Sequence, residues 1–429
     1  MKNFQIILIV MFIIAAVLGL LVFSGAIPLG GNNKEGGQGT VILWGTFRAE
    51  QINVLLEEFN NANQNFVVQY VQKNPENFDQ DLLEALASGT GPDMFFLSDD
   101  LAFHYSNKIL TIPYENFSLS SFKKSFASAG EVFLTSNGIL AFPMTVDPLV
   151  MYYNRSMLEA GGIVNPPTNW DDFVNTIPTL NKKDENNKII KSAAALGHFS
   201  NISYAKDILA TLFMQTGNKI VTEQNNRFVS DLSVSIGPFS LSNILQFYTD
   251  FADPQKNVYS WNKSLPLSRD FFSANNLAYY FGYASELVSL VNKNPNLNFL
   301  AAEMPQIKDY GFKLTSAKVT GLAISAFSKN MNTAFIAAGQ MSSGDFASKL
   351  ANNLGVVPAR RDLLAAKRAD AYSPIFYSSA LYAKSWLDPS TKDTDDIFRR
   401  MIDSVLSNSL RPVDAILDAQ AKLSLLLNK

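Results

Sequence analysis

The sequence predicts an α/β protein built from at least two lobes. The chain has 429 residues, more than a single hydrophobic core usually serves, and 47% of them are hydrophobic. Between residues 41 and 97, short apolar runs alternate with amphipathic segments of helical periodicity, and the connections are short. This alternation is typical of a largely parallel sheet whose crossovers are right-handed.

The N-terminal residues predict passage into a membrane. The run FQIILIVMFIIAAVLGLLVF, residues 4–23, contains one polar side chain. As a helix it would be about 30 Å long, the hydrocarbon thickness of a bilayer. Lys2 precedes it, so the positive-inside rule sends the rest of the chain out of the cytoplasm. We expect residues 1–26 to be a retained transmembrane anchor. A signal peptide is the alternative, because Ser24-Gly25-Ala26 approaches a cleavage site.

Structure is expected to begin after a flexible linker at residues 27–40, which is rich in Gly and Asn. The first strand is predicted at 41–46, and Thr46 is the expected N-cap of the helix that follows. Further strands are predicted at 66–71 and 94–97, each preceded by a helix. Ligands of such sheets bind beyond the carboxyl ends of the strands. That edge here carries 44-WGTFR-48 and 98-SDDLAF-103.

A lone carboxylate, Asp147, lies in the otherwise apolar stretch 141-AFPMTVDPLVMYYN-154, between Pro143 and Pro148. An unpaired charge in a core is costly, so we expect Asp147 to face a cleft. The predicted elements of the remaining chain are helices around 155–161, 168–180, 203–217 and 240–252, a strand at 319–327, an Ala-rich helix to about residue 343, and a helix over 412–427.

Composition excludes several classes of function. The net charge is −3 and no basic stripe is present, which disfavours nucleic-acid binding. The chain has no cysteine and only two histidines, so disulfides, thiolate chemistry and cysteine- or histidine-rich metal sites are excluded. Motifs of serine hydrolases, P-loop nucleotide-binding proteins, dinucleotide-binding folds and zinc proteases are absent from the sequence. We therefore expect no enzyme activity, no metal and no cofactor.

Four stretches, in the same order along the chain, resemble the extracellular solute-binding proteins of ABC importers, in the branch of maltose- and other sugar-binding proteins. They are 41-VILWGT-46, 89-GTGPDMFFLSDD-100, 138-GILAFPMTVDPLVMYYNRSMLEAGGIVNPPTNWDDF-173 and 320-TGLAISAFSKN-330 with 355-GVVPARRDLL-364. The resemblance implies a two-lobed periplasmic-binding-protein-like clamshell of type II. Its expected lobes are residues 41–145 with about 305–360, and residues 146–304 with about 361–429.

The ligand-binding residues expected from strand ends and resemblance have the chemistry that sugars need, namely planar hydrogen-bonding groups and flat aromatic rings. They are Trp44, Thr46, Arg48, Asp99, Asp100, Asp147 and Tyr283. Alternatives remain open for several: Trp44 as a core residue, Asp99 or Asp100 as a helix cap, and Arg48 as a solvated helix residue. Trp170 is expected to be structural, at the start of a helix.

The resemblance implies a monomeric binder that captures a carbohydrate-like solute by lobe closure and presents it to an ABC permease, held at the membrane by its N-terminal segment. Two alternatives stay open. One is a sensory or surface-interaction protein on the same fold. The other is an import protein for a peptide, a polyamine or a polyol phosphate.

Overall fold

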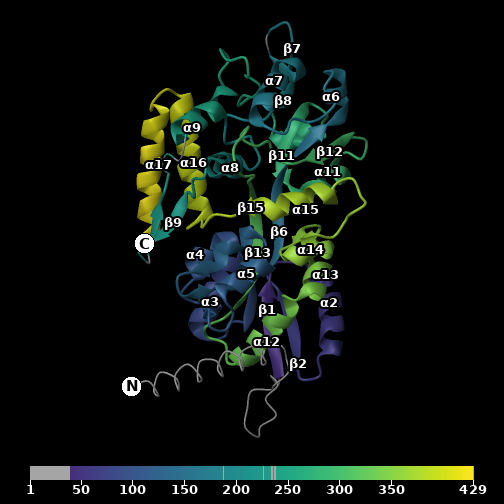
Figure 1. The fold of residues 1–429 in the computed structure, drawn as a ribbon, viewed down its shortest axis with the longest axis vertical. Helices are drawn as coiled ribbons and strands as arrows, with labels where there is room; N and C mark the ends of the chain where they lie inside the picture. The colour runs from purple at the N-terminus through teal and green to yellow at the C-terminus, as the bar shows by residue number, and fades with distance from the viewer. Residues whose placement is uncertain (1–38, 187, 226, 233–234, 236–237, 429) are drawn as a thin grey trace, which may run out of the picture.

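Two long strands, β6 (Ala141–Asn154) and β13 (Thr315–Ile324), run between two lobes in the computed structural model of this chain (Figure 1). The structure describes residues 39–428 except positions 187, 226, 233–234 and 236–237. The anchor or signal segment expected at 1–26 lies outside the described residues. In the part of the chain that is described, no helix combines the length and apolar character needed to span a bilayer.

The first lobe is built on the parallel strands that the sequence predicted. Strand β1 pairs in parallel with β2 on one side and with β3 on the other, so the carboxyl ends of β1 and β3 lie at one edge of the sheet. The elements of this lobe are β1 (Gly39–Gly45), α2 (Ala49–Ala62), β2 (Phe66–Gln72), α3 (Phe78–Ser88), β3 (Met94–Ser98), η1 (Asp99–Leu101), α4 (Ala102–Tyr105), α5 (Leu119–Ser125), η2 (Ser128–Phe133), β4 (Leu134–Thr135), β5 (Gly138–Ile139), α12 (Met331–Met341), α13 (Gly344–Leu354), β14 (Val357–Pro358) and α14 (Arg361–Leu364).

Two details at the start of this lobe differ from expectation. Gly39 and Thr40, predicted as linker, already belong to β1 and pair with β2. Helix α2 begins at Ala49 with Arg48 in the N-cap position and no side-chain cap, so Thr46 is not the cap. The apolar face of α2 is buried as its periodicity predicted, and this burial holds the helix on the sheet without a cap.

Strand β6 belongs to the sheets of both lobes. Its first half pairs with β13 and β14, and its second half pairs with β11 and β12. The register against β13 shifts so that Thr320 faces Thr145 and Gly321 faces Pro143. A proline has no amide hydrogen for the ladder, and a bulge is where a sheet tolerates one.

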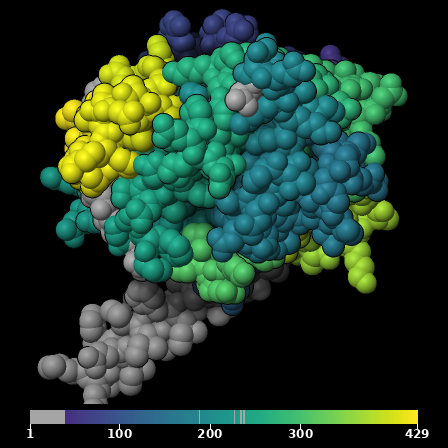
Figure 2. Space-filling model, turned by 90° about the horizontal axis from the view of Figure 1, so that it is seen from above, coloured from purple at the N-terminus to yellow at the C-terminus, as the bar shows by residue number. Residues whose placement is uncertain are grey.

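The second lobe carries the C-terminal helices, which Figure 2 shows as one surface body (yellow) beside residues from the middle of the chain. Trp170, expected to be structural, is buried at the start of α7 and donates its indole N–H to Gln215 at 2.7 Å. The elements of this lobe are α6 (Arg155–Ala160), α7 (Trp170–Leu180), β7 (Lys182–Lys183), β8 (Ile189–Ala194), α8 (Ala205–Gln215), β9 (Val221–Gln224), β10 (Arg227–Ser230), α9 (Leu241–Asp250), α10 (Ser268–Ser273), β11 (Leu277–Tyr283), η3 (Ala284–Glu286), α11 (Leu287–Lys293), β12 (Phe299–Ala302), α15 (Ser373–Tyr382), β15 (Ala383–Lys384), α16 (Thr391–Leu406) and α17 (Pro412–Leu427).

Candidate ligand-binding site

The two strands that link the lobes each place one charge at the junction. Asp147 of β6 and Lys318 of β13 face each other across the antiparallel ladder. Lys318 is exposed, although its neighbours along β13 on both sides are buried. Each is also the lone charge in an otherwise uncharged strand. The strands that join the two lobes therefore carry an acid and a base opposite each other. Together they make the surface between the lobes polar at this point.

Two tyrosine rings of the second lobe lie against this lysine. The Lys318 ammonium is 4.5 Å from the ring centre of Tyr283 and 5.1 Å from that of Tyr204. The two rings meet edge to face with their centres 4.8 Å apart. The Tyr283 hydroxyl is hydrogen-bonded to the carboxylate of Asp207, in the first turn of α8. Rings and ammonium therefore form one cation–π group at the junction.

Asp147 is held by the second lobe. Its carboxylate accepts a hydrogen bond from the backbone N–H of Ser285 at 2.9 Å. Burial raises the pKa of Asp147 to about 6, although the Ser285 hydrogen bonds and the Lys318 ammonium favour its ionised form. An acid in this condition is a strong acceptor for a ligand hydroxyl, because water does not fully solvate it.

Asp99 brings the first lobe into the same group. Burial raises the pKa of Asp99 to about 7, and the Asp100 carboxylate adds to the rise. Hydrogen bonds from Ser385 and from the Val319 amide, together with the Lys318 ammonium, oppose this rise only in part. The junction cluster, as we call it below, consists of Asp99, Asp147, Tyr204, Asp207, Tyr283 and Lys318.

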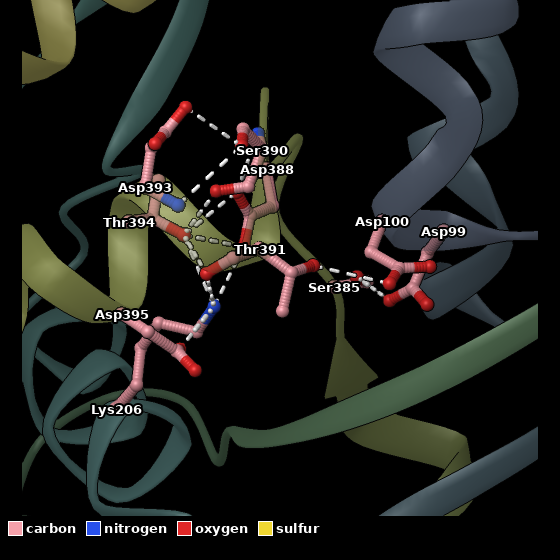
Figure 3. A network of polar contacts seen from close by, with 10 residues as sticks. All are labelled: Asp99, Asp100, Lys206, Ser385, Asp388, Ser390, Thr391, Asp393, Thr394 and Asp395. Carbon is pink, nitrogen blue, oxygen red and sulfur yellow. Dashed lines mark hydrogen bonds and ion pairs between the residues drawn. The ribbon is translucent and has the colours of Figure 1, made fainter. Parts of the chain in front are cut away.

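The lobes also touch directly beside this cluster, as Figure 3 shows. The Ser385 hydroxyl donates a hydrogen bond to Asp99. The Thr391 hydroxyl donates to Asp100 at 3.0 Å. Asp99 and Asp100 lie in the first turn of η1 rather than at its N-cap, which is Ser98. Their carboxylates face the other lobe, so the capping alternative for these two acids is wrong.

Of the seven residues predicted for the site, the structure brings Asp99, Asp100, Asp147 and Tyr283 together. The other three lie at the end of β1 or just after it, and within the described residues no hydrogen bond, ion pair or ring contact joins them to the junction cluster. Trp44 is partly buried against the core, with the Lys73 ammonium 3.6 Å from its ring centre. Within the described residues, neither the Thr46 nor the Arg48 side chain has a hydrogen bond or ion pair, and Arg48 is exposed. Whether any of the seven binds a ligand remains a prediction.

Sequence reasoning missed Lys318, Tyr204 and Asp207. The signal for Lys318 was available, since it is the lone charge in 315-TSAKVTGLAISAFS-328, the same pattern that singled out Asp147. Tyr204 and Asp207 carry no such signal, because polar residues at a helix start are ordinary. Their role depends on packing between α8 and β11, which only the fold defines.

The side chains of the cluster are better suited to binding hydroxyls and cations than to catalysis. It offers carboxylates as acceptors and tyrosine rings as apolar faces, but no activated nucleophile. In the described part of the chain, no group of three or more acidic or histidine side chains is arranged to hold a metal ion. The geometry is that of a recognition site.

Comparison with known proteins agrees with this geometry. The family model of the bacterial extracellular solute-binding proteins matches residues 48–340. The chain belongs to this family. Its members bind solutes and are not enzymes, so the absence of enzyme activity expected from the sequence is confirmed.

Individual relatives are more distant. A curated binding protein of Brucella abortus (strain 2308) is 26% identical over 98 residues, which are 22% of this chain and 23% of that relative, so the match spans about a quarter of its length. A solved cyclo/maltodextrin-binding protein complexed with maltotetraose has a TM-score of 0.73 at 16% identity, covering 91% of this chain and 98% of that one. The cyclic alpha-maltosyl-1,6-maltose binding protein of Arthrobacter globiformis has a TM-score of 0.73 at 14% identity, covering 91% and 99%. At these identities the likeness shows the fold, and the periplasmic-binding-protein architecture expected from the sequence is confirmed.

We expect the free energy of unfolding to fall as the pH rises from about 5 to about 8, and Asp99→Asn to remove part of that fall. Unfolded Asp99 loses its proton near pH 3.8, whereas the folded protein keeps it to about pH 7. The folded state thus binds more protons in this window, and stability present at its acidic end is lost as the pH rises through the folded pKa. Urea unfolding of both proteins measures this.

The difference in unfolding free energy between Asp99→Asn and the wild type should shift in favour of the variant by roughly 1–3 kcal/mol from about pH 5 to about pH 8. The raised pKa of Asp147 also makes the free energy of unfolding fall with rising pH. This effect is present in both proteins, so the difference between them reports on Asp99. Equal pH slopes for the two proteins would show that Asp99 ionises normally in the folded state.

Proposed function

We propose that this protein is the extracytoplasmic solute-binding component of an ABC importer, which captures a sugar or oligosaccharide by lobe closure and delivers it to a membrane permease. The observation that carries the proposal is the junction cluster. It draws Asp99 from one lobe, Tyr204, Asp207 and Tyr283 from the other, and Asp147 with Lys318 from the strands between them. A ligand held there would contact both lobes only when they are closed.

The chemistry of the cluster supports a polyhydroxylated ligand. Carboxylates accept hydrogen bonds from hydroxyls, and tyrosine rings pack against the apolar C–H faces of a sugar. The structures with similar folds include proteins solved with maltotetraose and with maltose, which favours the same class for this chain. Membrane tethering by residues 1–26 is part of the proposal and rests on their sequence alone.

A thermal-shift screen of the full-length protein tests the ligand class. The panel contains mono- and oligosaccharides, amino acids, peptides, polyamines and glycerol phosphates. A ligand at about 100 times its dissociation constant adds roughly 2.7 kcal/mol of stability, enough to raise the melting temperature by a few degrees. Stabilisation by sugars alone is the expected result. Stabilisation by another class alone would overturn the ligand assignment and leave the fold in place.

A cationic ligand such as a polyamine is the second candidate, because acids outnumber bases at the junction. Asp99, Asp147 and Asp207 all face one ammonium, that of Lys318. This excess also disfavours a phosphorylated ligand, which would meet like charges.

Lys318→Met separates the two candidates. Removing the ammonium should tighten binding of a polyamine by about tenfold, because one unit charge a few ångströms away contributes on the order of 1–3 kcal/mol at an effective dielectric constant of about 20. A neutral sugar should bind no more tightly to the variant than to the wild type. Titration calorimetry with one compound of each kind measures both effects, and tighter sugar binding in the variant would contradict the expectation.

A further inference from the structure

The lobes of this protein contact each other directly at more than one place. The Lys384 ammonium of β15 lies 3.3 Å from the Glu131 carboxylate of η2, and a second set of contacts forms at a short segment that follows β3. The hydroxyl groups of Ser385 and Thr391 reach this segment from the second lobe, and the Phe228 ring of β10 meets the Phe103 ring of α4 edge to face, with the ring centres 5.7 Å apart. We call these contacts the interlobe clasp. Its members are Asp99, Asp100 and Phe103 of the first lobe and Phe228, Ser385 and Thr391 of the second.

Thr391, a clasp residue of the second lobe, is positioned by the turn that begins α16. Asp388 organises this turn: its carboxylate accepts hydrogen bonds from the Ser390 N–H at 3.0 Å and from the Thr394 hydroxyl at 2.9 Å. Ser390 is the N-cap of α16, and Thr391 is its first residue. The position of Thr391 against Asp100 is therefore set by a turn that closes around one buried carboxylate.

The side chain of Lys206, in α8, points at the start of α16 and holds this turn in place (Figure 3). Its ammonium lies 2.8 Å from a carboxylate oxygen of Asp388, 2.8 Å from one of Asp395 and 3.0 Å from the Thr394 hydroxyl. It also donates to the backbone carbonyl of Thr391 at 3.3 Å. Lys206 is 7% exposed and Asp388 6% exposed, so the contact between these two residues is shielded from water, whereas Asp395 is half exposed. A buried ammonium with several acceptors fixes their relative positions more firmly than a surface pair does.

We propose that Lys206 is a positioning residue for lobe closure, which holds the start of α16 so that the interlobe clasp can form when the lobes close. The proposal deepens the proposed function, since it rests on closure as the capture step. Lys206 is not a member of the junction cluster, although it is bonded to one of its members. That member is Asp207, which is hydrogen-bonded to Tyr283. One helical turn thus carries both a contact of the candidate site and the support of the clasp.

The clasp would set how far the ligand-free protein is closed before any ligand arrives. A ligand that prefers the closed form then binds more tightly when the clasp favours closure, because it selects a state that is already populated. Weakening the clasp or its support should therefore shift the same equilibrium in the same direction.

Single-molecule energy transfer on the ligand-free, full-length protein tests this inference. The chain has no cysteine, so dyes attached at Glu57→Cys and Asp171→Cys report on the lobes alone. Both positions are exposed on helices of different lobes, α2 and α7. The protein with an unsubstituted clasp should show a resolved population at the short distance, and the complete absence of that population would overturn the clasp.

Two variants then probe the clasp and its support separately. Thr391→Val removes the hydroxyl that binds Asp100, and the closed-to-open ratio should fall about fivefold. Lys206→Met combined with Asp388→Asn removes the support without leaving a buried charge unpaired, and a fall of similar size is expected. Combining all three substitutions should give little further opening. The Lys206→Met/Asp388→Asn change acts by displacing Thr391, so it has no further effect once the Thr391 hydroxyl is gone. Lys263→Met is the matched control: it breaks an exposed 3.3 Å ion pair to Asp403, farther along α16, and should change nothing.

A wild-type distance distribution in a folded Lys206→Met/Asp388→Asn protein, alongside opening by Thr391→Val, would overturn the role of Lys206. No opening in Thr391→Val would overturn the clasp itself. If the Lys206→Met/Asp388→Asn variant does not fold, Asp395→Asn tests the same support, because the Asp395 carboxylate is half exposed and its loss is tolerated more easily. The closed-to-open ratio should then fall about twofold. An unchanged ratio would overturn the role of Lys206. These distances are measured without ligand. A failed sugar screen would therefore overturn the proposed function and leave the result on the clasp standing.

Discussion

Asp147→Asn is expected to weaken ligand binding by about 10- to 100-fold, because a hydrogen bond to a charged acceptor contributes roughly 1.5–3 kcal/mol. The melting temperature of the ligand-free protein should stay nearly the same. Asparagine keeps an oxygen that accepts the hydrogen bond from the Ser285 N–H. It also removes a charge whose burial already disfavours ionisation. Titration calorimetry with a ligand from the screen and thermal unfolding without it give the two values.

Asp171→Asn serves as the matched control, since Asp171 is an exposed carboxylate in the first turn of α7, on the second lobe. It should change neither affinity nor melting temperature. Unchanged affinity in Asp147→Asn would remove Asp147 from the binding site. A large loss of stability in the ligand-free variant would make Asp147 a structural residue instead.

Much of the fold could be predicted from periodicity. The strands at 41–46, 66–71 and 94–97 lie within one or two residues of β1, β2 and β3, because each is a short apolar run next to an amphipathic helix. Pro412 begins α17 as expected for a proline at a first helical turn. The start of α2 was wrong because burial of its apolar face, rather than a cap, decides where that helix forms.

The candidate site could be predicted only where its residues stand out in their own strand. Asp147 did, as a lone acid in an apolar run, and the same signal was present at Lys318. The contact between them requires that β6 and β13 be neighbours in this register, which no local pattern encodes. Asp207 and Ser385 reach the junction from segments far along the chain, so their place depends on the packing of whole helices.

The clasp and the candidate site share Asp99, and this links closure to protonation. Asp99 accepts a hydrogen bond from Ser385 of the other lobe, while its raised pKa reflects the burial that comes with closure. If opening exposes Asp99 to water, the closed form binds the proton more tightly, so closure takes up a proton over the pH range of that shift. The same distance measurement repeated at lower pH should therefore show more of the closed form.

Lys206→Met should lower the free energy of unfolding by about 3–5 kcal/mol, because removing one partner of a buried ion pair leaves the other charge buried and unpaired. Burial alone would lower the pKa of Lys206, but the Asp388 and Asp395 carboxylates outweigh it and raise the pKa, so the lysine is charged in the folded protein. Without the ammonium, Asp388 becomes a buried acid whose pKa is already raised by burial. Urea unfolding at neutral pH measures the loss.

Adding Asp388→Asn should restore part of that stability, since it removes the stranded charge while keeping an oxygen for the Ser390 N–H. The single variant should also regain stability as the pH falls, because a protonated Asp388 no longer needs a partner. Lys263→Met, which breaks the ion pair between an exposed lysine and Asp403 of α16, should cost no more than about 1 kcal/mol. If Lys206→Met cost as little as this control, the buried network would contribute nothing net to stability, and its conformational role would have to be carried by the clasp residues alone.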